Sequence, residues 1–409
     1  MTPVRILFLS DNFPPERNAP ATRVYERACY WAADGHRVTV ITCAPNFPDG
    51  KVFPGYRNRG GVEMRDGIRV VRVRTFITAN SGFFLRTVDF VSYMFAAIFA
   101  GLREEKPDLV AATSPQFFAA VGGWILGRLR SVPFVFELGD LWPASIGAVG
   151  ASRSRALLAF LERVELFLYR KSAAVVALTN RFRDDLVRRG ISPGHVTVVR
   201  NGVDLPRYTP RSRDAALARE WGLEGRFVVG YLGTHGMAHG LTNVLDAAER
   251  LHDPGVAFLL VGGGVERDAL VREAARRGLS NVIFRPAQDK AEMPRIWSLC
   301  DVALVHLKND PVFATVIPSK IFEAMGMGLP VLLVAPSGEA RDVVEEAGAG
   351  LLVPAGVPDT LVGAVERLRR DDTWRRELAA ASLAAAPLHS RRKQADEMLA
   401  VFRAVLSHA

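Results

Sequence analysis

The sequence predicts an α/β protein with two domains, each built on a mostly parallel β-sheet that helices cover on both faces. The chain has 409 residues, which is too long for one ordinary core and suggests two domains of roughly 200 residues. Short apolar runs alternate with longer helical patterns, and this rhythm restarts near the middle of the chain. With 49% hydrophobic and 23% charged residues, the composition is that of a globular protein.

The first half predicts a β-α-β unit and then a series of strands. A strand is expected at 5–10, a helix at 21–35 and a strand at 37–42. Five more strands are expected at 68–73, 108–113, 134–139, 173–179 and 196–202. The segment at 202–212 is rich in Pro and Arg and reads as a linker, so we place the first domain at residues 1–204.

The second half repeats the rhythm, and we place its domain at residues 205–388. A strand is expected at 227–233, followed by an amphipathic helix at 241–253. Five further strands are expected at 257–264, 282–286, 302–307, 330–335 and 350–354. The last segment, 389–409, is predicted to be a helix that packs back across the domain interface.

Residues 82–106 form an unusually apolar segment, with Arg86 and Asp89 near its start. A membrane-spanning helix needs about 20 apolar residues. Because the βαβ rhythm continues on both sides, a buried helix or one docked on a membrane surface fits better than a span. In the second alternative, residues 72–102 contact an anionic membrane: Phe83, Phe84 and Leu85 enter the lipid interface, and Arg72, Arg74 and Arg86 meet lipid phosphates.

The net charge and the cysteines limit the kinds of binding partner and the cellular compartment that we expect. A net charge of +9 predicts attraction to anions, although no zinc finger or RNA-recognition signature favours nucleic acid. Three widely spaced cysteines suggest a reducing, cytoplasmic compartment and no zinc site. The short apolar run at the start alternates like a strand, so we expect no signal peptide.

The stretch YLGTHGMAHG, residues 231–240, predicts a phosphate-binding turn. A glycine-rich turn between a strand and a helix points backbone N–H groups at the carboxyl edge of the sheet. His235 and His239 are four residues apart, a spacing that can bind zinc on a helix. Gly236 disfavours a helix between them and no third ligand is near, so a solvated turn explains the histidines better.

Two further stretches strengthen the prediction of an anionic ligand such as a nucleotide diphosphate. Gly262 and Gly264 lie in a second glycine turn between a strand and a helix, where the backbone can approach a ligand closely. At 318–326 a proline precedes Lys320 and Glu323, which share one helical face. They read as an ion pair or, alternatively, as a cation for phosphate oxygens and a carboxylate for a ribose diol.

Taken in order, the motifs of the second half resemble the donor domain of glycosyltransferase family 4. They are GTHGMAHG, LLVGGGVERDAL, NVIFRPAQ, PSKIFEAMGMGLPVLL and GEARDVVEEAGAGLLVP. The first half, with NFPPERNAPATR, GHRVTVIT, PNFPDGKVFPGYRNR, TSPQFFAAVGG and FELGDLWPASIGAVG, resembles the acceptor domain of a branch that includes N-acetylfucosaminyl transferases of O-antigen and capsule assembly. The resemblance implies the GT-B fold, two Rossmann-like domains facing a cleft, and retaining transfer from a nucleotide sugar without a metal or other cofactor.

The resemblance assigns roles in the donor domain and also reveals departures from the family pattern. The second Glu of the family's E-x7-E motif matches Glu323, whereas its first Glu matches Thr315. The Arg and Lys of the first glycine turn match Thr234 and His239, so Lys320 is predicted to supply the missing cation. The donor-binding residues implied are Gly233, Thr234, His239, Gly240, Gly262, Gly264, Thr315, Ser319, Lys320, Glu323, Gly338 and Glu339.

In the acceptor domain the resemblance implies Asn18, Pro20 and Arg23 as acceptor-binding residues. Gly139 replaces a family His or Arg, and Glu137 and Asp140 remain as carboxylates at a strand end. They are candidate catalytic residues together with Lys320, or else part of a hydrogen-bonded loop.

The function expected is transfer of an N-acetylated or deoxy hexose, from UDP, to a polyprenyl-diphosphate-linked saccharide at the inner face of the cell membrane. A sugar-nucleotide 2-epimerase of the same fold and a non-catalytic carbohydrate- or lipid-binding relative are the alternatives.

Overall fold

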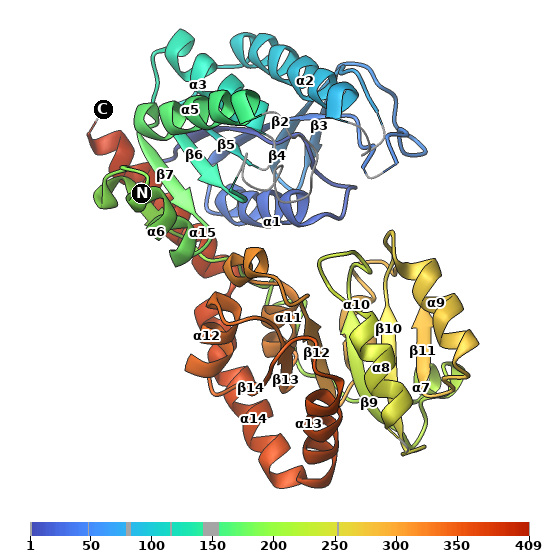
Figure 1. Cartoon of the computed structure of the whole chain (residues 1–409). Coiled ribbons are helices and arrows are strands. Elements are labelled where there is room, and N and C mark those ends of the chain that lie inside the picture. Colours follow the sequence, from blue (N-terminus) through green and yellow to red (C-terminus); the bar gives the residue numbers. More distant parts are fainter. Residues whose placement is uncertain are drawn as a thin grey trace. The chain divides into compact units, whose positions relative to one another are not determined.

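The computed structural model describes residues 2–47, 49–78, 83–114, 117–141, 155–251 and 253–408. The chain forms two compact units, one of Met1–Asn201 with Arg391–Ala409 and one of Gly202–Ser390 (Figure 1). Each unit holds one sheet with helices on both faces, so the predicted α/β class with two Rossmann-like units is confirmed. The chain passes from the first unit to the second after Asn201 and returns to the first unit after Ser390. The boundaries predicted from the sequence were 204 and 388.

The first unit contains an eight-stranded sheet in the order β3-β4-β2-β1-β5-β6-β7-β8. Its strands are β1 (Arg5–Leu9), β2 (Arg37–Cys43), β3 (Gly61–Arg65), β4 (Ile68–Val73), β5 (Leu109–Thr113), β6 (Phe134–Leu138), β7 (Ala174–Ala177) and β8 (Val196–Val198). Its helices are α1 (Ala19–Ala33), α2 (Phe83–Arg103), α3 (Phe117–Arg130), α5 (Arg155–Lys171), α6 (Asn180–Arg188) and α15 (Arg391–Ser407). A 3-10 turn, Pro193–His195, precedes β8.

Strand β3 is the one strand of this sheet that the sequence analysis did not predict. It pairs antiparallel with β4, and the register Arg65↔Ile68 leaves Asp66 and Gly67 as the loop. Both loop residues have positive φ, 50° and 79°, which an Asp-Gly hairpin turn requires. The Asp-Gly pair before the alternating run at 68–73 was therefore a usable signal.

The faces of this sheet carry different helices because successive residues of a strand point to opposite sides. In β5, Val110 and Ala112 pack in the cluster with α2, α3, α5 and α6. Leu109 and Ala111 pack in the cluster with α1 and α15. Figure 1 shows α2, α3 and α5 on one side of this sheet and α1 on the other.

Helix α15 completes the core of the first unit although it is the last segment of the chain. The indole Nε1 of Trp31 donates to the Ala395 carbonyl at 2.9 Å. The rings of Trp31 and Phe402 lie 5.4 Å apart between centroids. The packing of α15 against α1 buries a face of the sheet that would otherwise meet water.

The second unit contains a six-stranded parallel sheet in the order β11-β10-β9-β12-β13-β14. The strands are β9 (Phe227–Leu232), β10 (Val256–Val261), β11 (Val282–Arg285), β12 (Val302–His306), β13 (Val331–Val334) and β14 (Gly350–Val353). The helices are α7 (Ala215–Glu220), α8 (Thr242–Arg250), α9 (Arg267–Arg276), α10 (Met293–Trp297), α11 (Lys320–Gly326), α12 (Glu339–Glu346), α13 (Pro358–Arg370) and α14 (Asp372–Ala385). Two 3-10 turns, Pro311–Thr315 and Ala386–His389, complete it. The loops at the carboxyl ends of these strands carry most of the predicted donor residues.

Candidate active site

The two glycine turns of the second unit are joined to each other by backbone hydrogen bonds. Strands β9 and β10 pair in register, Leu232 opposite Val261, so their turns begin side by side. The Gly233 N–H donates to the Val261 carbonyl at 2.9 Å, and the His235 N–H donates to the Gly263 carbonyl at 2.8 Å. The predicted turns therefore form one double loop at the carboxyl edge of the sheet.

Glycine is required in the second turn because the backbones approach too closely for a side chain. A Cβ atom on Gly262 would lie 1.8 Å from the Gly233 carbonyl oxygen, and one on Gly264 would lie 2.5 Å from the His235 carbonyl oxygen. Both glycines also have positive φ, 157° and 143°. Gly262 and Gly264 thus shape the predicted pocket by allowing the two turns to pack together.

Lys320, the first residue of α11, points its ammonium group at the first glycine turn. Its Nζ lies 3.6 Å from the centroid of the Tyr231 ring, and a Cβ atom on Gly233 would lie 2.9 Å from it. The residue is only 8% exposed, and its Nζ has no hydrogen-bond partner in the part of the chain that the structure describes. Burial lowers the pKa of this amine to about 7, against the weaker opposing effect of Glu323.

His239 and His306 hold the first glycine turn against the end of β12. The His306 Nδ1–H donates to the His239 carbonyl at 2.6 Å, and the His239 Nδ1–H donates to the His306 carbonyl at 3.2 Å. Asn243 donates to the remaining ring nitrogen of His306 at 2.8 Å. The His306 ring, which donates through one nitrogen and accepts at the other, is therefore held neutral in one tautomer.

The electrostatic surroundings of His239 keep its ring neutral. Burial and the nearby Lys320 lower the pKa of His239 to about 4. The neutral His239 ring, which is hydrogen-bonded to the His306 carbonyl, does not replace the positive charge of the family lysine. Thr234, the other substituted position, is exposed, and its carbonyl accepts a 2.7 Å hydrogen bond from the Tyr231 hydroxyl.

The sequence predicted that His235 lies in a solvated turn, but it is a buried residue of the double loop. Its side chain is fully buried and packs near the rings of Tyr231 and Phe284. Burial lowers the pKa of His235 to about 4, with Lys320 acting in the same direction. No group of three or more His, Cys, Asp or Glu side chains that could hold a metal occurs among the described residues.

The remaining donor candidates flank Lys320 on and before α11. The Glu323 carboxylate is half-buried and accepts a 3.2 Å hydrogen bond from the Trp297 indole. Ser319 occupies the N-cap position of α11 without a side-chain capping bond. The Thr315 hydroxyl, at the family's first Glu position, donates to the Val312 carbonyl at 3.1 Å.

Gly338 and Glu339 lie where α12 begins. A Cβ atom on Gly338 would lie 2.1 Å from the Ala314 carbonyl oxygen, so glycine allows the 311–315 turn to pack on the start of α12. Glu339 is the first residue of α12, and its side chain is buried. Gly240, where the first turn ends, has φ +56° and approaches Lys308.

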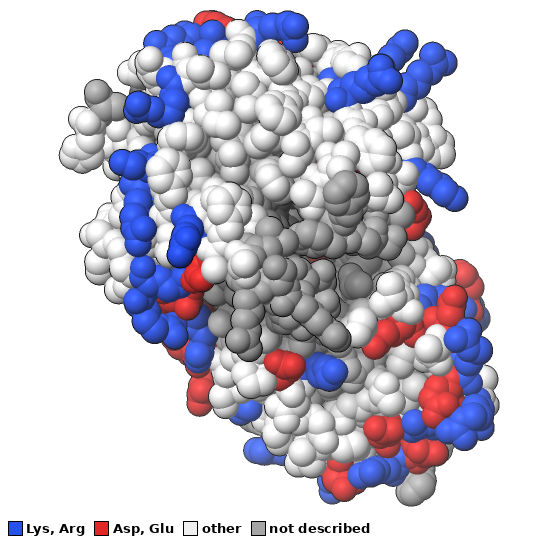
Figure 2. Space-filling view, turned by 45° about the horizontal axis from the view of Figure 1, so that its top comes forward, with Lys and Arg blue, Asp and Glu red and all other residues white. Residues whose placement is uncertain are grey.

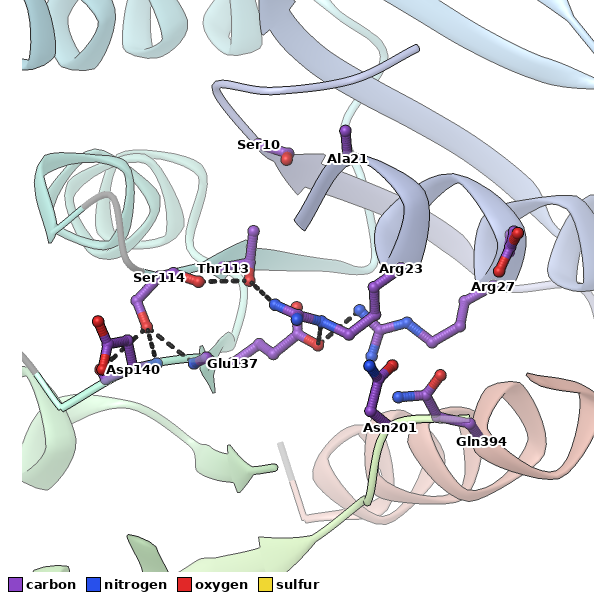
Figure 3. Close-up of polar contacts among 12 residues, drawn as sticks. Ser10, Ala21, Arg23, Arg27, Thr113, Ser114, Glu137, Asp140, Asn201 and Gln394 are labelled. Carbon is purple, nitrogen blue, oxygen red and sulfur yellow. Dashed lines mark hydrogen bonds and ion pairs between the residues drawn. The ribbon is translucent and has the colours of Figure 1, made fainter. Parts of the chain in front are cut away.

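In the first unit, the predicted acceptor residues organise the start of α1. The Asn18 side chain accepts a 3.0 Å hydrogen bond from the Ala21 N–H and caps the helix. Pro20 stands in the first turn, where its fixed φ suits the helix and no N–H is needed. Arg23, one turn on, points into the domain and donates to the Thr113 hydroxyl at 3.0 Å (Figure 3).

Glu137 is the centre of a buried ion-pair cluster, which revises its predicted catalytic role. Its side chain is 0% exposed, and one carboxylate oxygen accepts from Arg23 at 3.1 Å and lies 2.6 Å from an Arg27 nitrogen (Figure 3). The two guanidinium groups outweigh burial and lower the pKa of this carboxyl. The geometry favours a carboxylate that holds β6 to α1, and it removes Arg23 from the surface as well.

The next turn explains why a small residue stands at 139. The Ser114 hydroxyl accepts from the Gly139 N–H at 2.8 Å and from the Asp140 N–H at 3.3 Å (Figure 3). A Cβ atom on Gly139 would lie 2.4 Å from the Ser114 carbonyl oxygen and 2.8 Å from the Arg23 guanidinium. The histidine or arginine of related sequences does not fit this arrangement, whereas the half-buried Asp140 stays at the strand end as predicted.

Sequence reasoning missed three residues that the structure brings into these sites. Tyr231 provides the ring face beneath Lys320, and His306 with Asn243 secures the glycine turn. These residues look like ordinary strand and helix positions in the sequence. The partners lie 63 to 89 residues apart in the chain, so no local pattern signalled them.

Comparison with known proteins shows that both halves match glycosyltransferase families. Residues 18–202 match the glycosyl transferase 4-like domain, and residues 226–371 match glycosyl transferases group 1. The chain is 25% identical over 341 residues to the glycosyl transferase WcaI of Escherichia coli (strain K12), named for colanic acid biosynthesis, covering 81% of this chain and 83% of that one. It is 26% identical over 377 residues to a GDP-mannose-dependent alpha-mannosyltransferase of Mycobacterium tuberculosis (strain CDC 1551 / Oshkosh), covering 90% of each.

Solved structures share the fold. Sucrose-phosphate synthase from Thermosynechococcus elongatus superposes with a TM-score of 0.79 at 18% identity over 99% of both chains. HepE of Anabaena in complex with UDP superposes with a TM-score of 0.72 at 19% identity over 98% of this chain and 100% of that chain. The fold is therefore the GT-B fold of glycosyltransferases.

The fold and the two matching domains together define the class: this protein is a glycosyltransferase. Its two halves match a glycosyl transferase 4-like domain and a glycosyl transferases group 1 domain, in that order. The narrower likeness to N-acetylfucosaminyl transferases stays a prediction.

Proposed function

We propose that this protein transfers a hexose, N-acetylated or deoxygenated, from a UDP-sugar to a polyprenyl-diphosphate-linked saccharide during assembly of a surface polysaccharide. The donor is bound by the second unit. The colanic acid assignment in the name of one relative supports polysaccharide assembly, and the UDP complex of HepE supports the nucleotide. The three cysteines are free, which fits a cytoplasmic protein.

The observation that carries the proposal is the buried amine of Lys320 beside the double glycine loop. A buried ammonium without a hydrogen-bond partner is costly, and an anion that reaches it repays that cost. The Gly233 turn lies within contact of the amine, and such turns bind phosphate oxygens through backbone N–H groups. A diphosphate at this place would meet both groups.

The role we assign to Lys320 is to stabilise charge as it develops on the departing nucleotide diphosphate. A cation fixed in a low-dielectric site acts more strongly than one in water and needs no reorganisation during the reaction. Glu323, one turn along α11, is placed to accept hydrogen bonds from the ribose hydroxyls. We propose that the transfer proceeds with retention and without a metal, because Lys320 supplies the cation. A metal chelator should therefore leave the rate unchanged.

The affinity for a UDP-sugar is expected to weaken as the pH rises above about 7. The diphosphate binds the ammonium form of Lys320 better than the neutral amine, so binding raises the pKa of this group from about 7. Below pH 6 the amine is protonated in both states and affinity stays level. Above pH 7 each unit costs up to about tenfold, because one proton must be taken up.

Isothermal titration in two buffers of different ionisation enthalpy measures that proton directly, with uptake of nearly one proton per donor at pH 8. The His239→Gln variant should keep the same pH slope, because His239 stays neutral above about pH 4. If the slope disappears in His239→Gln, or no proton is taken up by the wild type, Lys320 does not hold the diphosphate.

The proposed function is tested by screening nucleotide sugars for thermal stabilisation and then for nucleotide release with lipid-linked acceptors. UDP-sugars should stabilise the protein more than GDP-sugars, with release only when acceptor is present. A donor converted to its 2-epimer without acceptor would instead identify an epimerase. Binding without release across all acceptors would identify a non-catalytic relative.

A further inference from the structure

Helix α2 turns an apolar stripe toward solvent, the reverse of the usual surface helix. Leu85, Val88, Phe95, Phe99 and Leu102 are all exposed, and their spacing puts them on one side of the helix. Phe95 and Phe99 are 53% and 58% exposed. Residues Leu85–Arg103 are long and apolar enough to cross a membrane, yet only 28% of their most apolar window is buried within the protein.

The helix nevertheless belongs to the first unit, so it lies along the domain surface and does not span a bilayer. Its inner side, with Tyr93 and Ala97, packs in the same core cluster as α3 and α5. Gly101 allows close packing, since a Cβ there would lie 2.3 Å from the Leu126 side chain of α3. Removing α2 from the sheet would expose this core.

The apolar surface continues onto the two neighbouring helices. Leu129, at the end of α3, is 59% exposed, and Phe160 on α5 is 60% exposed. Phe167 on α5 is also exposed, and its ring packs edge-on against Trp124 of α3 at 5.1 Å between centroids. We call the exposed residues Leu85, Val88, Phe95, Phe99, Leu102, Leu129, Phe160 and Phe167 the apolar face.

The exposed charges on these helices are mostly positive. They are Arg103 on α2, Arg128 on α3 and Arg163, Arg170 and Lys171 on α5, against the single exposed acid Glu162 among the described side chains of the three helices. Figure 2 shows a largely uncharged surface on this side of the first unit, with Lys and Arg at its margins. Such a rim attracts anions and would oppose pairing of this face with a second copy, because like charges would meet.

The structure changes the set of residues that can make the predicted membrane contact. Arg72 is buried, with its guanidinium bound to Glu63 and to the Cys43 and Pro14 carbonyls, so it is withheld from lipid phosphates. Phe83 and Phe84 carry side chains outside the described residues. Arg74 is exposed, as the predicted contact requires, and Arg86 is half-buried with its guanidinium 5.3 Å from the Phe90 ring centroid. The other exposed cations are Arg103 at the end of α2 and those on α3 and α5, two helices that the sequence had not connected with α2.

We infer that the apolar face docks flat on an anionic lipid surface, with its aromatic and aliphatic side chains among the acyl chains and the surrounding arginines at the lipid phosphates. An exposed apolar face with a basic rim is the signature of a protein that lies on a membrane and does not cross it. The inference stands on the first unit alone and does not depend on the proposed function.

Flotation with vesicles tests it. The wild type should float with vesicles that contain phosphatidylglycerol and remain at the bottom with phosphatidylcholine alone, and salt should weaken the binding. The double variant Phe95→Ser/Phe99→Ser should bind anionic vesicles at least tenfold more weakly. The matched control Val357→Ser/Leu388→Ser replaces two exposed apolar residues of the second unit that lie outside the glycine turns, and it should bind like the wild type.

Equal binding by Phe95→Ser/Phe99→Ser and wild type would overturn the inference, as would failure of the wild type to bind anionic vesicles. Light scattering tests the other possible occupant, a second copy of this chain. A dimer that Phe95→Ser/Phe99→Ser converts to a monomer would assign the apolar face to that copy. Donor-induced thermal stabilisation, measured on every variant, shows that the second unit is intact whether or not lipid binds.

Discussion

Turnover in the Lys320→Ala variant is expected to fall at least tenfold while the protein remains folded. Alanine removes the buried ammonium at the double glycine loop, and a tenfold loss corresponds to only about 1.4 kcal/mol of transition-state stabilisation. Because the amine is desolvated and has no hydrogen-bond partner among the described residues, its removal should not destabilise the fold. Steady-state kinetics with saturating acceptor, together with thermal denaturation, measures both quantities.

The matched control is Lys393→Ala on α15, where the lysine is exposed and pairs with Glu397 at 3.8 Å. That variant should retain wild-type kinetics, because surface ion pairs contribute little. Wild-type turnover in Lys320→Ala would exclude the amine from the reaction and leave the backbone of the turns as the anion holder.

The Gly262→Ala variant should lose about 3 kcal/mol of unfolding free energy and most of its donor affinity. The new methyl group would meet the Gly233 carbonyl oxygen at 1.8 Å, in a backbone conformation at φ +157° that alanine rarely adopts. The two turns must separate to admit it, which moves Gly233 away from Lys320. Chemical denaturation and donor titration measure the two losses.

Gly278→Ala separates steric contact from backbone strain. Gly278 also has positive φ, +67°, but a Cβ atom there meets nothing within 4 Å. This control should cost about 1 kcal/mol and leave donor affinity unchanged. If Gly262→Ala and Gly278→Ala lose the same unfolding free energy and bind the donor equally well, Gly262 is not needed for the close packing of the two turns.

The order of strands and helices could be predicted because each element has its own local pattern. The two glycine turns and the α11 start were also visible, since turn residues follow apolar strands directly. Strand β3 was missed because its run is short and polar, although the Asp66-Gly67 pair marked its turn. Local patterns thus sufficed for the architecture.

The roles of polar side chains could not be predicted in the same way, because they depend on partners far along the chain. Glu137 looked like a free carboxylate at a strand end, but Arg23 and Arg27 are more than 100 residues away in sequence. His239 looked like a residue of a solvated turn, but its ring donates to the carbonyl of His306, 67 residues away. Likewise, periodicity shows that α2 is apolar all round but not which side the domain covers.

The return of α15 to the first unit has a consequence for the order in which the protein is completed during synthesis. Residues 391–409 are synthesised after the whole second unit, yet Trp31, Ala395 and Phe402 are joined in one core. The second unit, which ends at Ser390, therefore has its whole sequence before the first unit does. A nascent chain that ends near residue 390 would lack α15, so the face of the N-terminal sheet that carries α1 would be partly uncovered and open to chaperones until that helix is made.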